Sequence, residues 1–211
     1  MPESQQHGCI WEDYIKRDVY HISQKIPYTA KFDIPKELNT RSPDTNVSIK
    51  TTQSKSVDMG DALRVFNNTE KTHLLVLRYV QEDNKKKLQE IVLCEMPNQQ
   101  VLFGSVTLEE IENLVSKVKA VPKGKANASV LSEIHAVKTS LNEKSGFIHF
   151  RPKIDSQNQR RLQCSINNFP SLLQSNPSLL LEKTTDGTLY HTTIPRELDS
   201  CRRQRKTGQS D

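Results

Sequence analysis

Two short apolar runs carry the residues that could do chemistry. Asp33 stands near the end of residues 28–34, and Lys50 lies within residues 46–52. If these runs pair as a β-hairpin, a carboxylate and an ammonium come together at one edge of a sheet. Carboxylates are preferred ligands of Mg²⁺, and a lysine beside them can orient a water molecule or hold a phosphate. The pattern therefore predicts metal-dependent cleavage of a phosphodiester.

The second run lacks one acid that such a site would use. Side chains alternate along a strand, so Val47 and Ile49 share one face, and Ser48 and Lys50 share the other. Ser48 has no negative charge to offer a cation, so a second carboxylate must come from elsewhere in the chain. Glu12 is the first candidate, and Glu37 and Asp44 are the next ones.

Glu12 belongs to an amphipathic segment that predicts a helix over residues 8–24. The apolar stripe of this helix consists of Trp11, Ile15, Val19 and Ile22. Glu12 and Lys16 form an i, i+4 pair at the margin of the stripe. A helix packed by this stripe can therefore present Glu12 near the sheet.

Over residues 8–96 the chain resembles the PD-(D/E)xK nuclease superfamily, which includes many type II restriction endonucleases. The resemblance is carried by the helix opening Gly8-Cys9-Ile10-Trp11-Glu12, by Asp33, and by Ser48-Ile49-Lys50 in place of acid-x-Lys. It implies that Asp33 and Glu12 bind Mg²⁺ and that Lys50 orients the attacking water or the scissile phosphate. It also implies that Ser48 contacts a phosphate or the water shell of the metal.

The resemblance extends to the biological role. It implies a site-specific endonuclease that cuts double-stranded DNA in a restriction system. A symmetric DNA site is matched by a two-fold symmetric protein, so we expect a homodimer.

Helix and strand patterns alternate along the chain and predict an α/β fold. We expect a central mixed β-sheet flanked by helices, with a restriction-endonuclease-like core. Beyond the first hairpin, the expected strands are residues 73–80, 88–96, 147–152 and 161–166. The expected helices are residues 58–67 with Asp58 as N-cap, 107–119 with Thr107 and Glu110 as a capping box, and 130–141.

These elements predict a single domain over residues 1–200. Its core covers about residues 8–120, and a further helix and a DNA-contacting hairpin cover about residues 121–170. Residues 201–211 hold four cations in a short polar segment and predict a disordered basic tail.

Basic and amide side chains outside the carboxylate site predict DNA contacts. Arg, Asn and Gln can read base edges, and Lys and Arg neutralise phosphates. The candidates are Lys55, Arg64, Lys123, Arg151, Lys153, Gln157, Arg160 and Arg161.

The composition is compatible with this interpretation. The chain of 211 residues has a net charge of +5, which favours an anionic partner. Its four cysteines are widely spaced, with no zinc-binding pattern, and predict free thiols in a reducing compartment. No apolar run is long enough to span a membrane, so we expect a cytoplasmic protein.

Two other classes of protein stay open. The serine at position 48 favours a catalytically inactive DNA-binding protein, and a protein-interaction domain is the third alternative. Asp33 can be a turn-former, Lys50 a charge that protects an edge strand, and Glu12 and Lys16 a surface helix pair. The only Asp-x-Lys sequence, Asp83-Asn84-Lys85, lies in a polar run and predicts a solvated turn.

Overall fold

A computed structural model describes residues 10–27, 30–122, 127–155 and 159–199. The chain divides into two compact units. The first unit comprises Met1–Gln53, Leu75–Leu93 and Glu182–Asp211, and the second comprises Ser54–Leu74 and Cys94–Leu181. Each unit is described by itself below.

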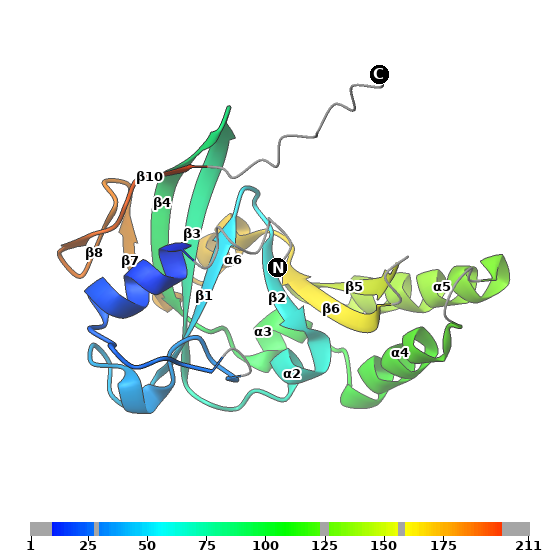
Figure 1. The fold of residues 1–211 in the computed structure, drawn as a ribbon. Coiled ribbons are helices and arrows are strands. Elements are labelled where there is room, and N and C mark those ends of the chain that lie inside the picture. The colour runs from blue at the N-terminus through cyan, green and yellow to red at the C-terminus, as the bar shows by residue number, and fades with distance from the viewer. Residues whose placement is uncertain (1–9, 28–29, 123–126, 156–158, 200–211) are drawn as a thin grey trace, which may run out of the picture. The chain divides into compact units, whose positions relative to one another are not determined.

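The first unit is built on a sheet with the strand order β1-β3-β4-β10, in which β7 also pairs with β4 (Figure 1). A tight turn at Asp83 and Asn84 joins β3 to β4, and Asp83 takes a left-handed φ of 50°, which Asp tolerates well. The strands are β1 (Asn46–Thr52), β3 (Thr72–Glu82), β4 (Lys85–Glu95), β7 (Leu180–Thr184) and β10 (Glu197–Asp199). A separate two-stranded ribbon consists of β8 (Thr188–Leu189) and β9 (Thr192–Thr193).

The N-terminal helix packs its apolar stripe into the core of this unit. Residues 10–14 are α-helical and continue directly into a π-helical turn, η1 (Ile15–Val19). Trp11, Ile15 and Val19 are fully buried in one cluster with sheet residues such as Leu75 and Leu77. The stripe predicted from the sequence therefore fixes the helix against the sheet.

The second unit contains a three-stranded sheet with the order β2-β6-β5 and the larger helices. Its strands are β2 (Val57–Asp61), β5 (Ile148–Ile154) and β6 (Arg160–Ile166). Helix α4 contacts β6, and α5 contacts β5 (Figure 1). The helices are α2 (Ala62–Phe66), α3 (Gln99–Phe103), α4 (Leu108–Ala120), α5 (Ala128–Lys144) and α6 (Phe169–Ser175), with a 3₁₀ turn, η3 (Pro177–Leu179).

Several predicted elements are present. The strand at residues 46–52, both strands of the hairpin at 73–96 and the pair at 147–166 are confirmed as β1, β3, β4, β5 and β6. Helix α4 begins after Thr107, whose side chain and that of Glu110 form the predicted capping box. Cys94 and Cys164 are buried free thiols, as predicted, and burial raises the pKa of Cys94 to about 12.

Other elements differ from the prediction. In the described part of residues 28–34, only Ile34 pairs, through an isolated antiparallel bridge to Val47. The start of the expected helix at 58–67 is strand β2, and Asp61, not Asp58, accepts the N-cap hydrogen bond of α2. Asp58 and Gly60 flank a β-bulge opposite β6, and the apolar residues Val57 and Met59 follow strand alternation.

The α/β class is confirmed, because both units combine sheets and helices or helical turns. The restriction-endonuclease-like core and the single-domain organisation stay predictions, and the expected basic tail at 201–211 lies outside the described residues. None of the helices in the described ranges has the length and apolar character needed to cross a membrane.

Candidate functional site

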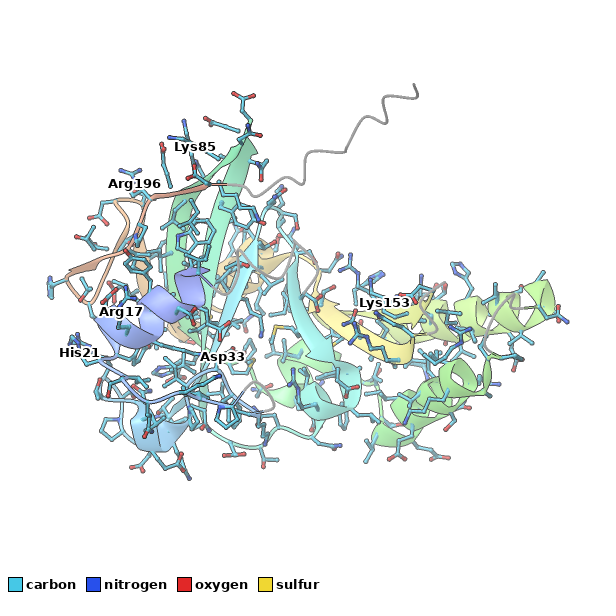
Figure 2. The ribbon with its side chains drawn as sticks, in the orientation of Figure 1. Arg17, His21, Asp33, Lys85, Lys153 and Arg196 are labelled. Atoms are coloured by element: carbon cyan, nitrogen blue, oxygen red, sulfur yellow. The ribbon has the colours of Figure 1, made fainter. Side chains whose placement is uncertain are left out.

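Asp33 is positioned by the bridge between Ile34 and β1. The backbone N–H of Ile34 donates to the carbonyl of Val47 at 3.0 Å, and the N–H of Val47 donates back at 2.8 Å. Ile34 and Val47 are fully buried, so the two chain segments are anchored by apolar contact as well. The bridge therefore places Asp33, which Figure 2 labels, next to β1.

One carboxylate oxygen of Asp33 is shared by three donors from β1. Oδ2 accepts a hydrogen bond from the N–H of Ile49 at 2.7 Å and from the Ser48 hydroxyl at 3.3 Å. The Lys50 ammonium forms an ion pair with the same oxygen at 3.7 Å. These donors fix the orientation of the carboxylate. Among the described residues, no hydrogen bond to the other oxygen, Oδ1, is found.

Glu12 is the second carboxylate of the site. It forms an ion pair with the Lys16 ammonium, its i+4 neighbour. Burial and the Asp33 carboxylate raise the pKa of Glu12, whereas the ammoniums of Lys16 and Lys50 oppose that rise. Glu12 and Asp33 also line the same pocket, which is the geometric link between Glu12 and the pair on β1.

The helix changes its hydrogen-bonding pattern next to Glu12. From Ile15 to Val19 the turn is π-helical, and the N–H of Tyr20 donates to the carbonyl of Ile15 at 3.0 Å. Single π-turns inside helices are rare and occur frequently at functional sites. The buried residues Ile15 and Val19 keep their places on the core side, so the π-turn does not disturb the packing of the helix.

A pocket of about 860 Å³ adjoins the two carboxylates. Glu12 and Asp33 both line it, together with the cations Lys16, Arg17 and Lys25. A third acid, Asp13, also lines the pocket, so its described lining holds three acids and three cations. The rest of the lining consists of Ser23 and Gln24 and of the apolar residues Ile22, Ile26, Pro27, Ala30 and Phe32.

Two carboxylates and a hydroxyl are oxygen groups of the kind that a hard divalent cation prefers. Mg²⁺ in proteins is commonly bound by one or two carboxylates, and its other ligands are water and substrate phosphates. Asp33 and Glu12 supply two carboxylates, and the Ser48 hydroxyl is a further oxygen nearby. Among the described residues, no cluster of three or more His, Cys, Asp or Glu side chains is arranged to hold a metal. Such an ion would therefore depend on water or substrate for the rest of its shell.

The other acidic candidates do not join this arrangement. Glu37 and Asp44 are exposed, and no contact between either side chain and Asp33 or Lys50 is found in the described structure. Asp83 and Asn84 form the tight turn between β3 and β4, and Lys85 forms an ion pair with Glu197. The expected turn therefore accounts for this Asp-x-Lys sequence.

The predicted DNA-contacting hairpin presents a cationic face. Antiparallel register places Arg151 opposite Gln163 and Lys153 opposite Arg161 on β5 and β6. Arg151, Lys153 and Arg161 are exposed, while the alternate residues Phe150 and Leu162 are buried on the other face. Neither Lys153 nor Arg161 pairs with an acid within the described ranges, although like charges directly opposite each other on a sheet are unfavourable.

The remaining DNA candidates have different surroundings. Arg160 lies on the core side of β6, and its guanidinium donates to the carbonyls of Val121, Pro122, Asp155 and Gln159. These bonds favour a structural role for Arg160. Lys55 and Arg64 are exposed in the second unit, and Lys123 and Gln157 lie outside the described residues.

Sequence reasoning did not assign roles to two groups that shape the site. The N–H of Ile49 makes the shorter of the two described hydrogen bonds to Asp33. Because every residue except proline has a backbone N–H, the amino-acid sequence does not reveal this donor. Lys16 lines the pocket as well as pairing with Glu12, a second role that its i, i+4 spacing does not reveal.

No protein-family model, no curated protein and no solved structure matches this chain. The function of this chain must therefore be inferred from the residues and geometry of the site itself.

Proposed function

We propose that this chain is a Mg²⁺-dependent endonuclease that hydrolyses phosphodiester bonds in duplex DNA at specific sites, in the manner of type II restriction enzymes. The proposal is carried by one observation. The Asp33 carboxylate, held by β1, forms an ion pair with the Lys50 ammonium and lines one pocket with Glu12 and its partner Lys16.

Each side chain has a distinct task in this proposal. Asp33 and Glu12 would hold the ion, and bound Mg²⁺ supplies charge stabilisation at the phosphate and a more acidic water. Lys50, at 3.7 Å from Asp33, can orient the attacking water or hold the scissile phosphate. The Ser48 hydroxyl donates to Asp33 and fixes its carboxylate, or turns to a phosphate oxygen.

The cationic face of β5 and β6 supports DNA as the substrate. Arg151, Lys153 and Arg161 stand on one exposed face with Gln163, and Arg and Gln side chains can read base edges. An anionic backbone would relieve the repulsion between Lys153 and Arg161. Lys55 and Arg64 are kept as further proposed phosphate contacts.

A DNA-binding protein without catalysis is the second candidate function. It is favoured by the serine at position 48, which leaves the described site with two carboxylates where a third would strengthen metal binding. The cationic face would then bind DNA with no hydrolysis. A protein-interaction domain is the third candidate, and no contact in the described structure favours it.

Cleavage of mixed-sequence duplex DNA in Mg²⁺ tests the proposal. The wild-type protein should give discrete fragments, and both Asp33→Ala and Lys50→Ala should slow cleavage by about 10²-fold or more. Asp44→Ala and Lys36→Ala remove exposed charges of the same kind from the same unit and should leave the rate unchanged. Binding without cutting by the wild type would support the second candidate.

Two further parts of the proposal concern assembly and location. Cutting both strands at a symmetric site calls for a homodimer, so sedimentation of the protein on its DNA site should show two chains per duplex. A cytoplasmic location remains part of the proposal.

A further inference from the structure

Each of the two carboxylates of the candidate site forms an ion pair with a different lysine. Lys16 pairs with Glu12, and Lys50 pairs with Asp33. All four side chains are mostly buried, with exposed fractions of 18% for Lys16, 27% for Glu12, 22% for Lys50 and 27% for Asp33. The two negative charges are therefore balanced by two positive charges in the absence of any ligand.

This balance changes when the carboxylates take a divalent cation. The Lys16 ammonium contacts Glu12 Oε1, one of the two oxygens through which Glu12 could hold a metal ion. With a metal bound, two carboxylates would face a dication and two ammoniums, an excess of two positive charges. A phosphodiester group carries one negative charge, so a bound DNA phosphate would reduce this excess from two to one.

The pocket offers a second position for the Lys16 ammonium, away from Glu12. Lys16 lines the pocket beside the carboxylates, as do Arg17 and Lys25. Arg17 already forms a two-pronged contact with Asp18, at 2.7 and 2.9 Å. Among these three cations, Lys16 is the one that contacts a carboxylate of the candidate site, that of Glu12.

We propose that Lys16 is a phosphate-positioning residue that exchanges partners, held by Glu12 in the metal-free protein and contacting a DNA phosphate in the adjoining pocket when Glu12 holds a metal ion. This inference rests on the proposed function and adds a named substrate contact to it. A helix pair with a purely structural role would instead affect only the stability of the helix.

Metal binding without DNA gives the first test. Lys16→Met removes the competing ammonium but keeps an unbranched apolar stem, so Glu12 is free for the ion. Titration calorimetry with Mg²⁺ at a fixed, mildly alkaline pH should show about two- to fivefold tighter binding than the wild type, the size expected for losing one partly exposed ion pair. Lys25→Met, which removes a cation from the same pocket, should bind Mg²⁺ as the wild type does. Unchanged or weaker binding by Lys16→Met would overturn the inference.

DNA binding with and without a divalent ion gives the second test. Ca²⁺ prefers the same oxygen ligands as Mg²⁺ and serves as the probe, with the DNA checked for cleavage. Without divalent ions, Lys16→Met should bind a short duplex as tightly as the wild type, because Lys16 is held by Glu12. With saturating Ca²⁺ it should bind about three- to tenfold more weakly, with a salt dependence lower by about one phosphate contact.

The two tests separate the inference from the proposed function. An equal loss of DNA affinity with and without Ca²⁺ would overturn the exchange of partners, because Lys16 would then be an ordinary surface cation. A wild-type protein that cuts no DNA would defeat the endonuclease proposal, yet both binding measurements would still report on Lys16. Thermal unfolding of Lys16→Met shows whether the variant is folded.

Discussion

Asp33 has a defined orientation because donors on a neighbouring strand hold it. The N–H of Ile49 and the hydroxyl of Ser48 both donate to Oδ2, and these two hydrogen bonds fix the orientation of the carboxylate. Serine in place of an acid thus has a structural consequence, because a carboxylate at position 48 would repel Asp33 where Ser48 donates to it. Ser48 therefore leaves the proposed metal site one acid short, yet it helps to orient Asp33, the first proposed ligand.

His73 offers a residue-scale prediction about pH. Its side chain is 6% exposed, and Nδ1 has no hydrogen-bond partner among the described residues. Burial lowers the pKa of His73, while Glu95 opposes the shift. His73 therefore binds a proton more readily in the unfolded chain than in the folded protein. Its contribution to the free energy of unfolding is fully present above a pH of about 6.5 and is lost as the pH falls below that value.

We expect the melting temperature of the wild type to fall between about pH 7 and pH 5, and His73→Gln to reduce that fall. His135→Gln, the same substitution at an exposed position of α5, should keep the wild-type slope. Melting curves across this pH range provide the measurement. Equal slopes for His73→Gln and the wild type would show that another group governs the acid response.

At the element scale, the features that were predicted correctly are those that depend on residues close together in the sequence. The strand at residues 46–52 and the capping box at Thr107 and Glu110 were predictable, because both depend on neighbours in sequence. Residues 28–34 were predicted to form a strand next to β1. In the described part of this segment, only Ile34 pairs with β1, through one bridge to Val47. The turn-rich segment after Ile34 gave no sign of that difference.

Strand β2 shows why a short apolar segment was misjudged. Val57, Met59 and Ala62 are buried, and the first two obey a period of two, but the sequence continues into the helix of Ala62–Phe66. The period changes within a few residues, so a helical pattern fitted the whole stretch equally well. Strands β7 to β10 were missed because two to five residues carry too little periodicity to identify.

The cationic face of β5 and β6 gives the element-scale prediction. Replacing Lys153 and Arg161 together with Ala should weaken duplex binding and lower the salt slope by up to about 2. Folding should be unaffected or slightly more stable, because two facing like charges are removed. Fluorescence anisotropy at several salt concentrations provides the measurement.

A matched control for this pair is the replacement of Lys117 and Lys144 with Ala. These cations lie in the same unit but are paired with Glu133 and Glu110. The control removes the same charge and should change DNA affinity much less. If both double variants weaken binding equally, net charge rather than the β5 and β6 face accounts for the interaction.

At the scale of the whole molecule, a net charge of +5 identifies an anionic partner as plausible but does not locate it. The structure offers two candidate binding sites for an anionic partner. One is the pocket beside Asp33 in the first unit, and the other is the cationic face of β5 and β6 in the second unit. The residues Asp33, Ser48, Lys50 and Glu12 were all selected from the sequence. The distances between these residues could not be predicted from the sequence, because they depend on long-range packing of the N-terminal helix on the sheet.

The Mg²⁺ dependence of nicking in closed circular DNA tests the central claim most directly, with Glu12→Gln compared with the wild type. If Asp33 and Glu12 together hold the ion, Glu12→Gln should need at least about tenfold more Mg²⁺ for half of its maximal rate. Glu37→Gln, an exposed acid of the same unit, should behave as the wild type does. An unchanged Mg²⁺ requirement in Glu12→Gln, or a wild type that never nicks DNA in Mg²⁺, would contradict the account.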